Sequence, residues 1–471
     1  MDSSNRSPQL ADALAVTTLG AYLLIVVGAT TALADATAAC QTWPGCNGQW
    51  IPTSSEPLLL IAWGHRVAAL LVGLLVLGTA ILTWRSDTGT KVRAAVAVAV
   101  ALYPVQVGLG ALAATASTPA LLSAAHLIVG VGIFAALVVG LAWRLSETTP
   151  ERAVTADAEP QPNHDATPEA AGRPTVADSG GGIDRGKRIV AAYVSLTKPR
   201  LMWLLCLVAA AGMALAAGPN LRLGTVVATL TGGVLAIGAS GTFNHVLERD
   251  IDRKMARTAD RPTATHEIPV RNALAFGFVL TAASLAAFLT VNLLATALGL
   301  VAILFYSVVY TLLLKPNTVQ NTVIGGFAGA LPALIGWAAV TNEIGLPALA
   351  LAGVIFLWTP AHFYNLAMAY KEDYERGGFP MLPVVRGEAV TRRHVLYYLG
   401  ATLVGAAALT AIAGLGWLYA ATTVAFGAVF LWAVVRLHRD RTRAAAFRAF
   451  HASNAYLGAL LVVILVEALV L

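Results

Sequence analysis

Long apolar stretches recur along this chain, and they constrain its fold more than any other feature. Of its 471 residues, 57% are hydrophobic and only 12% are charged, against about 25% charged residues in ordinary soluble domains. A run of about 20 apolar residues can cross a bilayer core of roughly 30 Å as a helix. We therefore predict an all-α fold, a polytopic transmembrane helical bundle.

The apolar runs form two blocks separated by a polar segment. The first block, residues 1–146, is predicted as a four-helix membrane domain with spans near 13–35, 57–83, 92–114 and 119–143. The second, residues 189–471, is predicted to have about nine spans, near 199–217, 223–243, 270–291, 293–314, 321–340, 346–368, 396–416, 419–436 and 453–471. Residues 147–188 are rich in Pro, Ala, Gly, Asp and Glu. Such a composition buries too little apolar surface to fold, so we predict a disordered linker.

The distribution of Lys and Arg orients both blocks in the membrane. In the second block, basic residues concentrate in the segments 185–198, 249–261 and 371–393, all on one side. The positive-inside rule places these segments and the linker in the cytoplasm, and the loop at 40–46 outside. The net charge of +6 reflects this bias and indicates no nucleic-acid partner. We expect a multi-pass protein of a cell (plasma) membrane.

A charged segment directly follows the expected span at 223–243. In it, Asn244, Glu248 and Asp252 are spaced i, i+4, i+8, which places them on one face of a helix. Clustered carboxylates repel one another unless a cation lies between them, and Mg²⁺ is commonly held by carboxylates together with substrate phosphates. The alternative is an ordinary solvated, charged loop. Nearby basic side chains are candidate phosphate contacts: Arg249, Arg253, Lys254, Arg257 and Arg261.

A second acidic cluster follows another expected span, on the same side of the membrane. It contains Lys371, Glu372, Asp373 and Glu375. Two such clusters facing each other could hold a lipid diphosphate through Mg²⁺, which would stabilise the diphosphate as it leaves. We therefore predict prenyl transfer. Its predicted catalytic and Mg²⁺-binding residues are Asn244, Glu248, Asp252 and Asp373.

At these residues the second block resembles the intramembrane prenyltransferase superfamily, whose members have nine spans and two acidic motifs. Here the first motif has Glu248 in place of an Asp, and Asp373 is the best anchor of the second. Five segments together resemble the protohaem IX farnesyltransferase family within it: LTKPR (196–200), ERDIDRKMARTADRP (248–262), NTVIGGFAGALPALIGWAA (321–339), HFYNLA (362–367) and DYERGGFPMLPVV (373–385). Ala361 departs from that family's pattern, which has Pro there.

The resemblance implies the reaction and further site residues. A farnesyl group would pass from farnesyl diphosphate to a vinyl group of haem b, with hydration, giving haem O. Lys198, Arg200, Lys315 and Lys371 are candidate diphosphate contacts, although long basic side chains at span ends also serve as interface anchors beside membrane lipid. His362 lies within a span, where it is either a haem contact or a hydrogen-bonded core histidine.

The first block carries two intramembrane histidines at similar depth. His65 and His126 each lie about seven or eight residues inside their spans from the outer side, or roughly 10–12 Å deep. Histidines at matched depth on neighbouring helices can ligate one haem iron from both sides. The alternative is two unrelated, hydrogen-bonded histidines.

An outer loop of the first block carries Cys40 and Cys46 in the segment CQTWPGCNG. On the oxidising side of a membrane, these cysteines form either a disulfide or a free redox pair. The loop and the two histidines resemble one half of haem A synthase. That family has Glu three residues before the first histidine, where this chain has Ala62. The resemblance therefore implies a haem-holding or vestigial module. It also implies a haem A synthase or a terminal oxidase assembly as the partner that takes haem O.

Two rival functions remain open. The first is prenyl transfer to another acceptor, a quinone precursor or a lipid. The second belongs to another class, a bis-histidine membrane cytochrome or haem-handling protein, in which the acidic loops would be solvated charge only. Turnover that depends on Mg²⁺ would separate the two classes.

Overall fold

The protein is built from helices long enough to cross a membrane. The computed structural model describes residues 6–470, apart from 35, 37–38, 54, 116–118 and 148–181. Within this described part, every regular element is helical, and 13 helices are long and apolar enough to span a bilayer. The predicted all-α membrane fold is therefore confirmed, and so is the number of spans.

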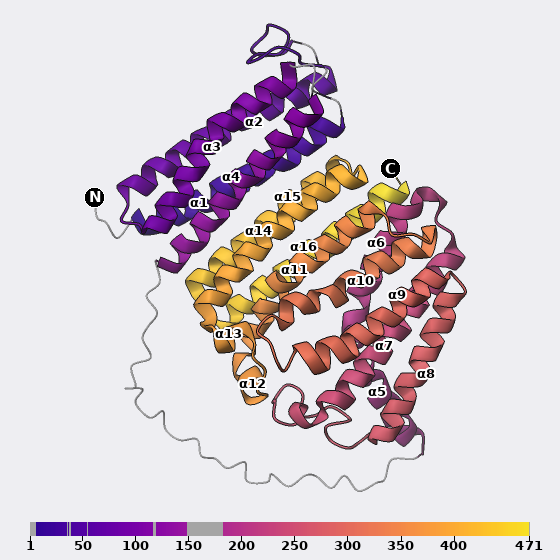
Figure 1. The fold of residues 1–471 in the computed structure, drawn as a ribbon. Helices are drawn as coiled ribbons and strands as arrows, with labels where there is room; N and C mark the ends of the chain where they lie inside the picture. The colour runs from indigo at the N-terminus through magenta and orange to yellow at the C-terminus, as the bar shows by residue number, and fades with distance from the viewer. Residues whose placement is uncertain are drawn as a thin grey trace, which may run out of the picture.

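The first four helices form one group, shown in indigo and violet in Figure 1. They are α1 (Arg6–Leu33), α2 (Pro57–Arg85), α3 (Thr90–Thr115) and α4 (Pro119–Glu147). Within the group, α3 packs along α4, and α1 contacts both α2 and α4. Each helix is apolar around most of its circumference, which is the pattern of a helix surrounded by lipid and other helices.

The remaining helices form a second, larger group. Its spans are α6 (Pro199–Ala217), α7 (Leu223–Asp252), α8 (Val270–Leu289), α9 (Leu293–Leu304) continued by the π-helical segment η3 (Phe305–Leu314), α10 (Asn321–Thr341), α11 (Leu346–Ala369), α14 (Gly387–Ala413), α15 (Trp417–Asp440) and α16 (Arg443–Val470). Three short helices complete it: the 3-10 turn η2 (Gly218–Asn220), α12 (Lys371–Arg376) and α13 (Leu382–Val385). Small residues let neighbouring helices approach closely: a Cβ on Gly336 of α10 would lie 2.0 Å from the Ala209 carbonyl oxygen of α6.

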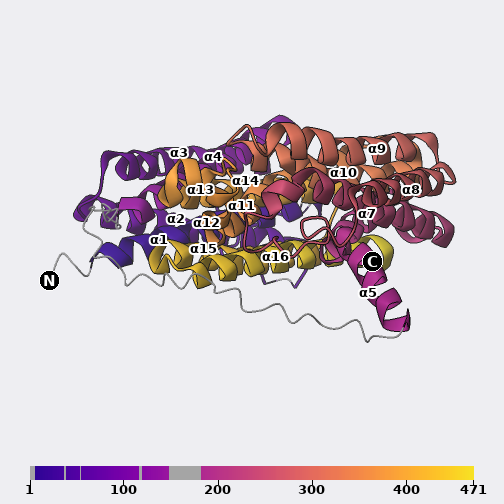
Figure 2. The same cartoon turned by 90° about the horizontal axis from the view of Figure 1, so that it is seen from below.

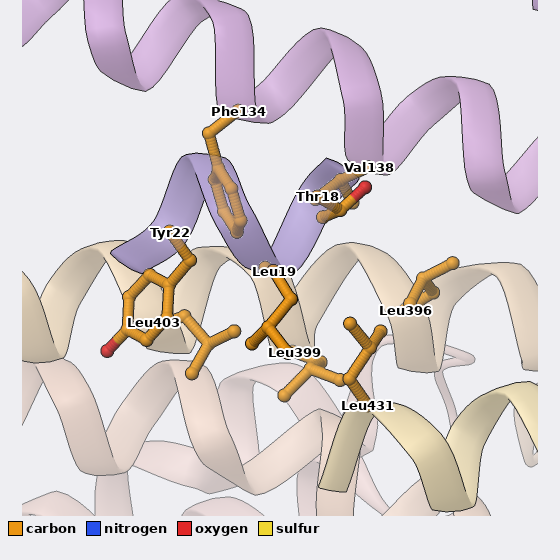
Figure 3. A pocket seen from close by; sticks show the side chains of 10 residues that line it. Thr18, Leu19, Tyr22, Phe134, Val138, Leu396, Leu399, Leu403 and Leu431 are labelled. Carbon is orange, nitrogen blue, oxygen red and sulfur yellow. The ribbon is translucent and has the colours of Figure 1, made fainter. Parts of the chain in front are cut away.

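The two groups pack against each other, with α1 and α4 of the first on α14 and α15 of the second. Figures 1 and 2 both place α1–α4 at one side of the bundle and α8 and α9 at the other. Gly400 on α14 leaves room for Val138 of α4, whose methyl groups would lie 3.1 Å from an added Cβ. Figure 3 shows the side chains, most of them apolar, that line a cavity at this interface. The volume of this cavity is about 10 Å³. That space is too small for a ligand, so the interface is a packed one.

The predicted linker at 147–188 ends earlier than expected. Helix α5 (Gly182–Leu196) begins inside it, so residues 182–188 are helical rather than disordered. Its Ala192 and Leu196 are buried in a cluster with Val246 of α7, and this burial supplies the stability that a solvated linker lacks. Residues 148–181, the rest of the predicted linker, lie outside the described residues.

Several helices extend beyond the apolar runs that predicted them. Helix α7 continues to Asp252, α14 starts at Gly387 and α16 starts at Arg443, whereas the predicted spans ended at 243 or began at 396 and 453. A helix does not end where the bilayer does, because its backbone hydrogen bonds are internal. The extension of α7 makes the acidic motif part of a rigid helix rather than part of a loop.

Candidate functional site

The last turns of α7 carry the first acidic motif on a buried face. Asn244, Glu248 and Asp252 are all in the helix and are exposed by only 1%, 3% and 0%. Asp250 points elsewhere, and its side chain is 66% exposed. The predicted helical face is therefore present. Its burial argues against a merely solvated charged loop, because buried carboxylates need a compensating partner.

Each of the three motif residues faces its own cation. The Lys198 ammonium donates to Asn244 Oδ1. Lys315 Nζ lies 2.6 Å from Glu248 Oε1, and Arg261 Nη1 lies 2.9 and 2.8 Å from the two carboxylate oxygens of Asp252. These cations come from three separate places in the chain. The arrangement is a cluster of three cations and two carboxylates with little solvent exposure.

Close backbone contact brings Lys198 to this cluster. A Cβ on Gly241 would lie 2.8 Å from the Leu196 carbonyl oxygen, so a larger residue there would push the end of α5, and with it the turn that carries Lys198, away from α7. Lys198 itself has φ 56°, a left-handed conformation that turns the chain between α5 and α6. Burial, together with the nearby Arg261 and Lys315, lowers the pKa of Lys198 to about 7.

The π-helical segment η3 supplies a second set of contacts to the motif. Thr311 accepts a hydrogen bond from Asn244 Nδ2 at 3.1 Å, and the Tyr306 hydroxyl accepts one from Lys198 at 3.2 Å. Neither residue was predicted as part of the site, because both lie within an apolar run. One signal was present: Ser307, Thr311 and Lys315 are polar residues spaced by four. Short π-helical segments within α-helices are frequent at functional sites.

The second acidic loop packs directly on the first. Asp373 of α12 accepts a hydrogen bond from the Ala256 backbone N–H at 3.1 Å and another from Arg376. Burial acts to raise the pKa of Asp373, but these hydrogen bonds outweigh it and lower that pKa. Arg257 donates to the Tyr374 hydroxyl at 3.3 Å. The structure therefore brings the two predicted acidic clusters together at one end of the helix bundle, which we call the mouth.

Other predicted contacts do not converge on the acids. Arg249 and Arg253 pair with the exposed Asp250, at 3.4 and 3.3 Å. Arg200 and Lys254 are exposed. Lys371 lines a separate polar pocket formed by α11, α12 and the adjacent ends of α14–α16. Arg249, Arg253 and Lys254 are close to the motif in sequence, but their side chains are not directed at its buried face. Arg200 and Lys371 belong to other helices, α6 and α12.

His362 is enclosed by aromatic rings and a serine. Its ring stacks on Trp358 and Phe450 with centroids 4.2 and 4.3 Å apart, and its Nδ1 lies 2.7 Å from Ser453 Oγ. Trp358 Nε1 donates to the Ser453 carbonyl oxygen, which ties the group together. These contacts match the hydrogen-bonded core histidine, the second of the two predicted roles.

The donor set at the mouth suits Mg²⁺ chemically. Carboxylate and amide oxygens are the ligands this ion prefers, usually completed by substrate phosphates. Within the described part of the chain, no three His, Cys, Asp or Glu side chains are gathered closely enough to hold a metal by themselves. In this structure, Lys315 and Arg261 form ion pairs with Glu248 and Asp252, the carboxylates that a metal would use.

The first helix group contains a second polar site. The rings of His65 on α2 and His126 on α4 have centroids 6.4 Å apart. His126 contacts Gln106 of α3 through both ring nitrogens, and the Nδ1 of His65 is buried without a hydrogen-bond partner among the described residues. The two predicted histidines therefore face each other inside the four-helix group.

The outer loop is fastened to the helix that carries His65. Cys40 and Cys46 form a disulfide with Cα atoms 4.9 Å apart. The Arg66 guanidinium donates to the carbonyl oxygens of Thr42 and Cys40 at 2.6 and 2.9 Å, and to two more in the same loop. Ala62, one turn earlier on α2, packs beneath the two cysteines. The loop thus lies over the end of α2 that carries His65.

Comparison with known proteins agrees with this two-part description. The model of the UbiA prenyltransferase family matches residues 204–458, and the model described as cytochrome oxidase assembly protein matches residues 11–161. A solved structure of a digeranylgeranylglyceryl phosphate synthase aligns with 60% of this chain and 99% of its own, with a TM-score of 0.51 at 15% identity. At that identity, the likeness concerns the fold alone.

Two archaeal relatives match almost the whole chain. The protoheme IX farnesyltransferase 1 of Natronomonas pharaonis is 64% identical over 457 residues, and the protoheme IX farnesyltransferase of Haloarcula marismortui is 60% identical over 462 residues. Each alignment covers 97% of this chain and 98% of the relative. With a family model over more than half of its length and relatives of such identity, the chain belongs to the UbiA prenyltransferase family.

Proposed function

We propose that this protein transfers the farnesyl group of farnesyl diphosphate to a vinyl group of haem b and makes haem O for terminal oxidases. The C–O bond between farnesyl C1 and the diphosphate breaks, and the vinyl carbon bonds to C1. Water then adds to the resulting cation, losing a proton, to give a hydroxyethylfarnesyl substituent. The names of the near-full-length relatives support haem as the acceptor.

One observation carries the proposal: two acidic clusters and three cations meet at one mouth of an otherwise apolar bundle. Asp373 is hydrogen-bonded to the backbone of the segment that follows Asp252, so the two clusters form one site. A diphosphate ester with a long apolar tail fits both features. Its charged head would lie among the ions, and its tail would lie between the helices.

The cations have a direct role in holding the diphosphate. Lys198, Lys315 and Arg261 can move from Asn244 and the carboxylates to phosphate oxygens, with which they form charge-assisted hydrogen bonds. The motif oxygens of Asn244, Glu248, Asp252 and Asp373 would then be free to hold Mg²⁺. When bound, Mg²⁺ supplies Lewis-acid stabilisation of the departing diphosphate. Thr311 holds the Asn244 amide so that its Oδ1 faces the cation side.

Turnover of the purified protein with haem b, farnesyl diphosphate and Mg²⁺ tests the proposal. Haem products are followed by mass, for the wild type and for Asp252→Asn. A gain of farnesyl plus water that disappears in the variant is the expected result. Transfer to a small aromatic or lipid acceptor, with none to haem, would replace the substrate and keep the chemistry. Absence of transfer to any acceptor would overturn the proposal.

The first helix group supports a separate proposal, that it binds haem through His65 and His126. With ring centroids 6.4 Å apart, His65 and His126 would be close enough together to hold one haem iron. Histidine is a common axial ligand of haem iron. A Soret absorbance titration with haem b, repeated on His126→Ala, tests this directly.

The membrane orientation follows from the same loops. We place the mouth with Asp252 and Asp373 on the cytoplasmic side of a cell membrane, because the basic loops gather there, and the disulfide loop outside. Labelling of single cysteines introduced at Asp260 and Asn47, from either side of sealed vesicles, would test it. Haem O made here would serve a haem A synthase or oxidase assembly, and co-purification from native membranes would test that partnership.

A further inference from the structure

Gln106 on α3 contacts both ring nitrogens of His126, which is an unusual arrangement for one residue. Its backbone carbonyl oxygen lies 3.0 Å from His126 Nδ1, and its side-chain Nε2 lies 3.2 Å from His126 Nε2. Gly110, one turn further along α3, makes room for the ring: a Cβ there would lie 2.9 Å from His126 Cε1. The ring therefore has little freedom to turn.

The two contacts have opposite consequences for a metal. A carbonyl oxygen can only accept, so Nδ1 carries the proton and Nε2 is left with its lone pair free. A backbone carbonyl behind a metal-binding histidine orients such ligands in general. The side-chain amide, however, donates to that same lone pair and occupies the place that iron would take.

The side chain of Gln106 is poorly satisfied in this position. Its Oε1 is buried and has no hydrogen-bond partner within the described residues. Leaving a buried acceptor without a hydrogen bond is unfavourable, so little holds the amide in place beyond its bond to His126. The amide can leave this position more easily than the backbone can.

We infer that Gln106 is a positioning residue of the haem site with two separable parts. Its carbonyl sets the tautomer of His126, and its side-chain amide covers Nε2 and would have to move aside for Nε2 to ligate haem. The inference rests on the proposed binding of haem by His65 and His126. The other ring, His65, has no corresponding hydrogen bond to fix its tautomer, because its Nδ1 has no partner in the described structure.

Haem affinity of side-chain variants tests this inference. Gln106→Leu removes the amide, and Gln106→Asn shortens it so that it cannot reach Nε2; both keep the backbone carbonyl. Each is expected to bind haem b about two- to tenfold more tightly, the range that corresponds to one net hydrogen bond. The Soret titration is done on the full-length protein. Tyr103→Phe is the matched control, because that hydroxyl donates to the Ala69 carbonyl and contacts neither histidine.

The outcomes separate this inference from the function on which it rests. Unchanged or weaker haem binding by both Gln106 variants, with normal thermal unfolding, would overturn the role of the amide and leave the haem site standing. Failure of the wild type to bind haem at all would overturn both. The haem bound to Gln106→Leu should also give a low-spin spectrum, because both histidines remain. A high-spin spectrum of this variant would contradict the inference.

Discussion

The two polar sites of this protein neutralise their buried groups differently. At the acidic site, Asn244, Glu248 and Asp252 each face a Lys or Arg. In the four-helix group, His65 and His126 face each other, and His126 also contacts the neutral Gln106. Arg66 lies next to His65 in sequence but donates to loop carbonyls.

This difference indicates what each site is suited to hold. Exchangeable ion pairs suit a ligand that brings its own charges, such as a diphosphate with Mg²⁺, because every ion can find a new partner. Neutral imidazoles in an apolar bundle suit a metal inside a large apolar ring. The two helix groups therefore pack as one body but contain different kinds of polar site.

The largest expected effect separates the mouth from the histidine site. Asp252→Asn should lower farnesyl transfer by about 10²- to 10³-fold, the usual cost of removing one preorganised electrostatic group, while haem binding by the first group stays unchanged. Asp250→Asn is the control, because that carboxylate is exposed and off the buried face. Similar losses of farnesyl transfer in both variants would show that the charge of the whole segment matters and that the buried face of α7 has no special role.

The reciprocal change should leave the mouth intact. His126→Ala should weaken haem binding by the first group by about 100-fold or more, because an iron ligand is lost and even supporting partners of ligands contribute 10–100-fold. Farnesyl transfer with saturating haem b should stay within a few-fold of the wild type. Loss of transfer in this variant would show that the first group delivers the acceptor.

A third change tests whether Lys315 occupies the position at Glu248 that a metal ion would take. Lys315→Met leaves Glu248 buried without its partner and should lower stability by about 2 kcal/mol, below the value for fully buried pairs because Lys315 lies at the mouth. Mg²⁺ should then raise the unfolding temperature more in this variant than in the wild type. Equal responses to Mg²⁺ would argue against metal binding at Glu248.

The smallest effect concerns the contact between the two groups. Gly400→Leu would force a side chain against Val138 and should lower stability by about 1 kcal/mol or somewhat more, as overpacking does. Gly353→Leu on α11 is the control, since a Cβ there meets nothing within 4 Å. Thermal unfolding in detergent measures both. Identical melting temperatures would show that the interface is more adaptable than its packing indicates.

Local patterns were sufficient to predict several parts of the site. The spacing of Asn244, Glu248 and Asp252 depends only on helical periodicity, so it could be read before any fold was known. The pairing of His65 with His126 followed from their depth in the membrane. Their contact with Gln106 did not, because a glutamine within an apolar run carries no signal of its neighbour.

Long-range contacts decided what periodicity could not. Arg249 and Arg253 were predicted as phosphate contacts with Arg261, yet they pair with Asp250 while Arg261 returns to Asp252. The surroundings of His362 likewise depend on Ser453 and Phe450, some 90 residues away. The amphipathic helix α5 extends into the predicted linker because residues of α7 and α8 bury its apolar side.

By itself, the sequence determined that the chain is a helical membrane protein of four and nine spans, with an acidic helical face and a pair of histidines. These features follow from hydrophobic length and helical repeat, which are local properties of the chain. The tertiary structure decided which cation faces which acid, how the π-helical segment reaches Asn244, and how α1 and α4 pack on α14 and α15. Such contacts join residues far apart in sequence, and only close packing of the complete bundle selects them.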